Sequence, residues 1–267
     1  MVAFQVWDLT TPVQIRAAPF SFKMALYTPI RRKEHSGAYK KFKEASKEDE
    51  ALISYIKNQK IVDKEDTILD VGGRRGQISL KIQSPEKVTI VDVDPKVKPF
   101  DSRAKMINKS IQEAEPELEN YDLILISHIL GDLGYAEIQG TMVKKLFNHL
   151  KPKGKIILCF NKNGDFLDEL KKHFEFAFPN IKTLYDYFDE TILEEKPLDA
   201  LEKKNYDFSV TLKADSFREL AAYCWVLFSG YELEEEPVVG AFEKFLKKNL
   251  EKPEFVFNQR IILLQKD

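Results

Sequence analysis

The chain has 267 residues, of which 43% are hydrophobic and 31% charged, and its formal net charge is −2. This composition is that of a globular protein, and the length allows one large domain with an appendage or two smaller domains. The near-neutral charge offers no general attraction to nucleic acid or to an anionic membrane, and no apolar run approaches the roughly 20 residues that span a bilayer.

The compartment is indicated by the N-terminal residues and by the cysteines. The stretch MVAFQVWDLTTPVQ has no basic segment followed by an apolar one, so we expect no signal peptide. Cys159 and Cys224 both lie in apolar surroundings, which favours reduced, buried thiols over a disulfide framework. We therefore expect the protein in a reducing cytoplasm.

Residues 1–60 are expected to form an N-terminal arm and a helical lid over residues 61–267. Residues 1–30 show little periodicity, and six basic residues between 31 and 43 form either a solvated helix face or a contact for an anionic substrate. His35 and Tyr39 are candidate substrate contacts if this segment folds over the site. The pattern Ser46-x-x-Asp49 predicts a capping box for a helix through about Gln59.

The most informative stretch is residues 67–94, TILDVGGRRGQISLKIQSPEKVTIVDVD. It predicts a strand over Thr67–Val71, a glycine turn, a short helix and a second strand over Lys87–Val93, which is a βαβ unit. The glycines allow a ligand to approach the backbone closely, and the helix start supplies N–H donors. Asp92, 22 residues after Asp70, ends the second strand where an acid can accept both hydroxyls of a ribose.

Further strands alternate with helices along the chain. Strands are predicted at 105–108, 121–126 and 155–160, with a short crossover helix near 113–120 and an amphipathic helix over 136–150. Beyond these we expect a helix over 165–174, a strand over 207–212, a helix capped by Ser216-x-x-Glu219, another helix from Pro237, and a final antiparallel strand over 255–264. The predicted fold is α/β: a doubly wound, Rossmann-like, mostly parallel seven-stranded sheet with an antiparallel C-terminal strand and a helical excursion at about 180–253.

The glycine spacing indicates the kind of nucleotide. A nicotinamide fingerprint would read G-x-G-x-x-G, and no frame satisfies it because position 74 is arginine. Instead ILDVGGRRG resembles motif I of the class I S-adenosylmethionine (SAM) methyltransferases, and VTIVDVD, YDLILISHIL and LFNHLKPKGKIILCF resemble their following motifs in the same order. The resemblance covers roughly residues 37–175, and GGRRGQISLKI is distantly similar to the small-amine methyltransferases that include histamine N-methyltransferase.

The resemblance implies a set of site residues. Those assigned to the cofactor are Asp70, Gly72, Gly73, Gly76, Asp92, Val93, Ser110, Ile111 and Ser127. His128, just past the fourth strand, is the candidate general base, and Asp132 is placed to orient it or to bind substrate. Two departures from the pattern are Arg74 in a glycine position and Lys40 and Lys41 where amine methyltransferases offer an acid, with Glu34 and Glu44 as the nearest acids.

These features predict in-line methyl transfer from SAM to nitrogen or oxygen of a small molecule, with S-adenosylhomocysteine as product. The four histidines and two cysteines show no metal-ligand spacing, so no metal is expected. Methylation of a protein or RNA is the alternative within enzymes, kept open for RNA by the basic residues at 31–43. A non-catalytic binding module, in which Arg74 reshapes the turn, is the alternative from another class, and a nicotinamide enzyme ranks below both.

Overall fold

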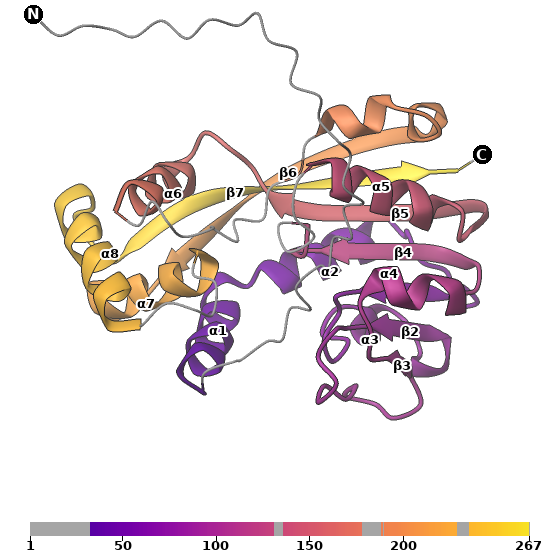
Figure 1. The fold of residues 1–267 in the computed structure, drawn as a ribbon, viewed down its shortest axis with the longest axis horizontal. Coiled ribbons are helices and arrows are strands. Elements are labelled where there is room, and N and C mark those ends of the chain that lie inside the picture. Colours follow the sequence, from indigo (N-terminus) through magenta and orange to yellow (C-terminus); the bar gives the residue numbers. More distant parts are fainter. Residues whose placement is uncertain (1–32, 131–135, 178–187, 189, 229–234, 267) are drawn as a thin grey trace, which may run out of the picture.

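The computed structural model describes residues 33–130, 136–177, 188, 190–228 and 235–266. Its centre is a seven-stranded sheet in the order β3-β2-β1-β4-β5-β7-β6 (Figure 1). Strands β1 to β5 pair in parallel, and β7 runs antiparallel to both β5 and β6. The predicted mostly parallel sheet with an antiparallel C-terminal strand is confirmed.

The elements have the following bounds. The strands are β1 (Ile68–Val71), β2 (Val88–Val91), β3 (Lys105–Ile107), β4 (Tyr121–Ser127), β5 (Leu150–Asn161), β6 (Glu202–Lys213) and β7 (Glu254–Gln265). The α-helices are α1 (Lys33–Ser46), α2 (Glu48–Asn58), α3 (Ser79–Ile82), α4 (Ile111–Ala114), α5 (Ala136–Phe147), α6 (Phe166–Ala177), α7 (Phe217–Phe228) and α8 (Glu235–Asn249). Short 3₁₀ helices are η1 (Pro85–Lys87), η2 (Glu115–Glu117), η4 (Glu190–Glu194) and η5 (Leu198–Ala200).

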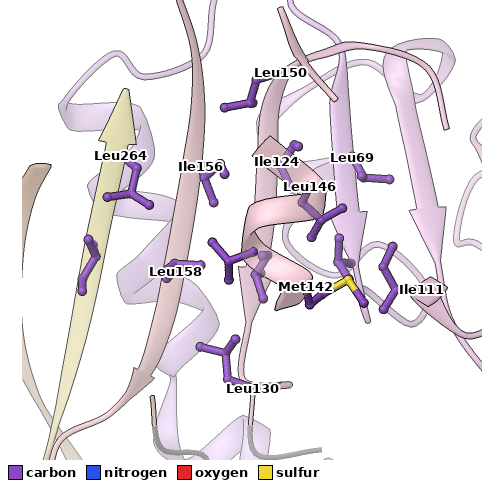
Figure 2. Packing of buried hydrophobic residues seen from close by; sticks show 14 of the residues in the cluster. Leu69, Ile111, Ile124, Leu130, Met142, Leu146, Leu150, Ile156, Leu158 and Leu264 are labelled. Carbon is purple, nitrogen blue, oxygen red and sulfur yellow. The ribbon is translucent and has the colours of Figure 1, made fainter. Parts of the chain in front are cut away.

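Helices cover both faces of the sheet. On one face α5 packs through Met142 and Leu146 on Ile124 of β4 and Ile156 of β5 (Figure 2). On the other face α2 buries Leu52, Ile53 and Ile56 against alternate residues of the same strands. Because both faces are covered, β1 and β2 are buried at every position, as their continuous apolar sequences predict.

A third cluster joins helices α1, α6, α7 and α8 to the far ends of β6 and β7 (Figure 1). Its large side chains include Trp225 of α7, Phe242 of α8 and Phe42 of α1, each at most 2% exposed. Most of the C-terminal aromatics therefore form core packing. Phe42 also packs α1 against the cluster that contains α7 and the end of β6.

The junction of α1 and α2 differs from the sequence prediction. Ser46 is the last residue of α1, and α2 begins after Lys47, which adopts a left-handed conformation with φ 53° and provides no side-chain cap. The predicted capping box at Ser46 and Asp49 is therefore wrong. The corresponding prediction at the start of α7 is right, because the backbone N–H of Glu219 donates to Ser216 Oγ at 3.1 Å.

Strands β5, β6 and β7 are longer than predicted. Leu150, expected to end the preceding helix, and the stretch from Lys151 to Gly154, expected as a turn, already lie in β5, although its register with β4 shifts before Lys155. Strand β6 pairs with β7 along its whole length, from Glu202 opposite Gln265 to Lys213 opposite Glu254. Its first six residues are all exposed, so they show no alternation of polar and apolar side chains that sequence could detect.

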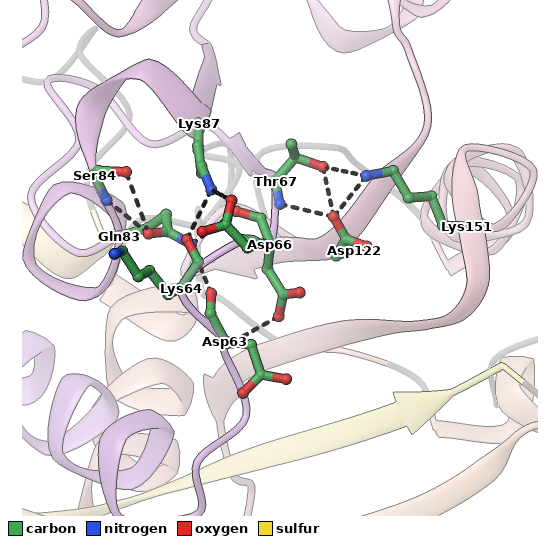
Figure 3. A network of polar contacts seen from close by, with 10 residues as sticks. Asp63, Lys64, Asp66, Thr67, Gln83, Ser84, Lys87, Asp122 and Lys151 are labelled. Carbon is green, nitrogen blue, oxygen red and sulfur yellow. Dashed lines mark hydrogen bonds and ion pairs between the residues drawn. The ribbon is translucent and has the colours of Figure 1, made fainter.

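The amino ends of the strands are joined by a polar network (Figure 3). The carboxylate of Asp122 accepts from Thr67 N and Thr67 Oγ1, both at 2.8 Å, and from Lys151 Nζ at 2.7 Å. These contacts hold the starts of β1, β4 and β5 together, at the edge opposite the candidate site. Within the described part of the chain, no helix has both the length and the apolar character needed to cross a membrane.

Candidate active site

The candidate site lies at the carboxyl ends of β1, β2, β4 and β5. In an open parallel sheet this edge is where ligands bind, because the loops and helix starts that follow the strands converge there. Strand β1 lies between β2 and β4. The residues that follow these strands are therefore brought close together in space.

The glycine turn after β1 is held in a tight conformation. Gly72 has φ 69° and its N–H donates to Val91 O at 2.8 Å, which ties the turn to the end of β2. A Cβ on Gly72 would lie 2.4 Å from a methyl carbon of Ile129, and one on Gly76 would lie 2.8 Å from Leu80. The turn therefore requires glycine at both positions.

Asp70 lies beneath this turn. Its carboxylate accepts from Ser79 Oγ at 2.5 Å, and a Cβ on Gly73 would lie 2.2 Å from Asp70 Cγ. Burial raises the pKa of Asp70 to about 6, with a further contribution from the charges of Asp49 and Asp92, while the hydrogen bond from Ser79 opposes the shift. Ser79 was not among the predicted site residues.

Asp92 follows β2 and is 6% exposed. Its N–H donates to Ile107 O at 3.1 Å, and its Oδ1 accepts from the N–H of Asp94 at 2.9 Å. Val93, the residue expected to pack on an adenine, is 39% exposed. Among the described residues, neither Asp70 nor Asp92 forms an ion pair with a lysine or arginine.

Ser110 and Ile111 stand at the start of α4. Ser110 caps this helix in a capping box, since its Oγ accepts from Glu113 N and Glu113 Oε2 accepts from Ser110 N. Ile111 is 5% exposed and belongs to the core under α5. The hydroxyl of Ser110 is thus already engaged locally, and the backbone of this loop is the part left to meet a ligand.

Ser127 is the last residue of β4, and His128 follows it. His128 has φ 54°, and its N–H donates to Cys159 O at 3.0 Å, which ties the residue after β4 to the end of β5. The imidazole Nε2 lies 3.5 Å from Cys159 Sγ and 3.9 Å from Glu48 Oε2. Ser127 Oγ is buried and has no hydrogen-bond partner in the described part of the chain.

Glu48 is the main site residue that the sequence analysis missed. It is 4% exposed, and its carboxylate accepts from Lys43 Nζ at 2.6 Å and from Gln259 Nε2 at 2.8 Å. Burial alone would raise the pKa of Glu48, but the charges of Lys43 and His128 and these hydrogen bonds outweigh it and lower the pKa to about 2. Lys43 also contacts Asp49 at 2.5 Å. The N-terminal helices thus bring a permanent carboxylate to His128.

Signals for Glu48 in the sequence are weak. The run Glu48-Asp49-Glu50 is that of an ordinary acidic first turn of a helix. Its burial follows from the left-handed break at Lys47 and from Gln259, which is 211 residues away in sequence. Neither the conformation of Lys47 nor the contact with Gln259 can be predicted from the residues around Glu48.

The other N-terminal candidates are only partly described. Tyr39 lies on α1, and the Cζ of Arg74 stands 4.7 Å from its ring centroid. His35 lies on α1 and its side chain is outside the described residues, as is the whole of Asp132. Whether α1 and α2 act as a lid stays a prediction.

Comparison with known proteins places the fold. No protein-family model matches the sequence, and no curated protein matches it. Among solved structures, a SAM-dependent methyltransferase from Archaeoglobus fulgidus is similar, with a TM-score of 0.52 and 17% identity over 85% of this chain and 99% of that one. A protein from Bacillus halodurans with a provisional methyltransferase assignment is also similar, with a TM-score of 0.54 and 12% identity over 80% of this chain and 98% of that one. The chain has the Rossmann-like fold of these methyltransferases.

Proposed function

We propose that the protein is a SAM-dependent methyltransferase that transfers a methyl group to nitrogen or oxygen of a small molecule. The observation that carries the proposal is the pair of buried carboxyl groups, Asp70 and Asp92, on either side of a glycine turn that ties β1 to β2. Buried carboxylates without a cationic partner are costly, and a ligand with positive charge and hydroxyl groups would satisfy them. SAM offers both.

The residues of the turn fit the cofactor. Asp92, buried at the end of β2, would accept the ribose hydroxyls, and exposed Val93 beside it would cover the adenine. The N–H groups after the glycine turn and the carboxyl of Asp70 would border the methionyl part. Bound SAM supplies a methyl group that is already activated by its sulfonium sulfur, so the protein chiefly has to align and dehydrate the acceptor.

His128 is the candidate base for an acceptor that must lose a proton. It follows β4 at the same edge of the sheet as the cofactor turn, and the carboxylate of Glu48 would stabilise the imidazolium that forms when His128 takes the proton. The acceptor lone pair forms the new bond to carbon, and the electrons of the broken carbon–sulfur bond remain on sulfur. We expect His128→Asn to lower turnover about 100-fold without a comparable loss of cofactor binding.

The burial around His128 favours a small acceptor over a macromolecule. Glu48 beside His128 is 4% exposed, and Gln259, which donates to Glu48, is buried, so this side of His128 is enclosed by the protein rather than open to solvent. The net charge of −2 also disfavours an RNA acceptor, because RNA-binding surfaces have an excess of basic residues.

Labelled methyl transfer tests the acceptor class. The protein is incubated with methyl-tritiated SAM and a cell extract that is divided by size and treated with nuclease or protease. We expect label in the low-molecular-weight fraction, insensitive to both treatments and absent with Asp92→Ala. Label retained in protein or in nuclease-sensitive material would contradict a small-molecule acceptor.

A further inference from the structure

Arg74 occupies a position in the glycine turn where an arginine is strained. It has φ 51°, in the left-handed region that a glycine adopts without penalty and that other residues rarely adopt. Backbone strain of this kind is concentrated at binding and catalytic sites. The chain thus holds a bulky cation directly beside the proposed cofactor turn.

The guanidinium of Arg74 is positioned by an aromatic ring rather than by a carboxylate. Its Cζ lies 4.7 Å from the ring centroid of Tyr39 on α1, and within the described ranges it forms no ion pair. Arg103 and Arg260, in contrast, each bind an aspartate through two nitrogens. A guanidinium stacked on a ring keeps its N–H edge available for bidentate binding of a planar anion.

The groups around the turn are mainly acidic, so Arg74 determines whether an anionic group can bind there. Asp70 and Asp92 are buried carboxyl groups nearby, and Lys43 is occupied by Glu48 and Asp49. An anionic group that entered this edge of the sheet would be repelled by the acids unless a cation met it. Arg74 supplies that cation at the turn itself.

We propose that Arg74 binds the carboxylate of the cofactor's methionyl group, with its guanidinium held against Tyr39. The inference rests on the proposed function, because it assigns a residue to one end of SAM. In this role Arg74 recognises the amino-acid part of the cofactor. Its bulky side chain would then contribute to cofactor binding rather than block the turn.

The test compares SAM with decarboxylated SAM, which keeps the sulfonium and the ammonium and lacks only the carboxylate. Both are titrated calorimetrically into the parent protein, Arg74→Gln and Arg75→Gln. Arg75 is the matched control, since it is the adjacent arginine and donates to Lys98 O at 3.1 Å while its Cζ stacks 4.2 Å from the Phe100 ring centroid. We expect Arg74→Gln to weaken SAM binding about tenfold or more and to change binding of decarboxylated SAM less than twofold. Arg75→Gln should alter neither.

Several results would overturn this role for Arg74. One is that Arg74→Gln weakens the binding of SAM and of decarboxylated SAM equally, and another is that it does not weaken the binding of SAM. A third is that Arg74→Gly binds SAM more tightly than the parent, which would favour a non-catalytic module in which Arg74 blocks the site. Retained binding of decarboxylated SAM shows that Arg74→Gln is folded. Failure of the parent to bind either ligand would instead remove the proposed function, so the two failures are distinguishable.

Discussion

Asp70 is a buried carboxyl group whose pKa is raised, and its charge state bears on the proposed cofactor binding. It is 3% exposed, and burial raises its pKa to about 6, so it changes charge close to neutrality. In the free protein the pKa lies above the ordinary value of 3.8, which means that the folded state holds this proton more tightly than the unfolded state. The contribution of Asp70 to the free energy of unfolding therefore falls as the pH rises from about 4 through about 6.

Binding of a cationic cofactor should show the opposite dependence on pH. The ionised carboxylate attracts the positive charges of SAM, so we expect its affinity to rise several-fold between about pH 5 and about pH 7 and then to level. Calorimetric titration across this range measures the effect, and Asp70→Asn should bind more weakly with a flat profile. A parent protein whose affinity is independent of pH would show that Asp70 is not coupled to the cofactor.

Gly73 provides a steric test at the same place. An alanine Cβ there would lie 2.2 to 2.5 Å from the three carboxyl atoms of Asp70, which is itself held by Ser79. We expect Gly73→Ala to destabilise the fold by about 1–3 kcal/mol and to weaken SAM binding. Urea unfolding and calorimetry measure the two effects.

The control for Gly73 is Gly240, on α8. A Cβ there meets nothing within 4 Å, so Gly240→Ala should stabilise the helix by up to about 1 kcal/mol and leave binding unchanged. If the two alanine variants had the same stability and the same affinity for SAM, the close approach of the turn to Asp70 would not matter for folding or binding.

At the residue scale, sequence predicts the part of the site that is local. Asp70, the glycines and Asp92 lie within one βαβ unit, so their spacing alone brings them to adjacent strand ends. Glu48 and Gln259 could not be predicted this way, because their contact joins two distant segments through the packing of α2 on the sheet. The tilt of Arg74 toward Tyr39 depends on the placement of α1 in the same way.

Among the elements, the α1–α2 junction is the one most closely joined to the site. Phe42 anchors α1 in the C-terminal helical cluster, and Glu48 at the start of α2 meets Lys43, Gln259 and His128. Glu48, which is paired with Lys43, therefore ties the N-terminal helices to β7 and to the end of β4.

Removal of the charge at Glu48 should loosen this connection. Glu48→Gln leaves Lys43, a half-buried cation, paired with Asp49 alone, and we expect the free energy of unfolding to fall by about 3 kcal/mol. Since the pKa of Glu48 is lowered from 4.5 to about 2, its contribution is fully present above about pH 4.5 and is lost as the pH falls toward 2. Urea unfolding at neutral pH and at about pH 3.5 measures both expectations.

The exposed neighbour Glu50 is the matched control for this variant. Glu50→Gln should change the free energy of unfolding by less than about 0.5 kcal/mol. Equal effects of the two substitutions would indicate that Glu48 has no special role in docking the N-terminal helices.

Element boundaries show where sequence reasoning fails. Ser46-x-x-Asp49 matches a capping box, yet Ser46 completes the preceding helix and its hydroxyl is buried without a partner among the described residues. The four-residue pattern carries no information on whether another helix runs into it. The exposed half of β6 was missed for a related reason, because its pairing with β7 is made by the backbone and not by apolar side chains.

On the scale of the whole molecule, the two edges of the sheet differ in their polar groups. The amino edge is joined by Asp122, Thr67 and Lys151, while the carboxyl edge holds the buried acids Asp70 and Asp92. The alternation of strands and helices predicted the doubly wound class. The insertion of β7 between β5 and β6 is fixed by contacts between distant segments, so the sequence predicted its direction but not its place.

The most direct test of this account is calorimetric titration of the purified chain with SAM and with S-adenosylhomocysteine, with NADH as the control. We predict micromolar binding of both sulfur nucleosides at one site per chain, no binding of NADH, and strongly reduced binding in Asp92→Ala. A folded protein that bound neither sulfur nucleoside, or that bound NADH instead, would contradict the assignment of this sheet edge to SAM.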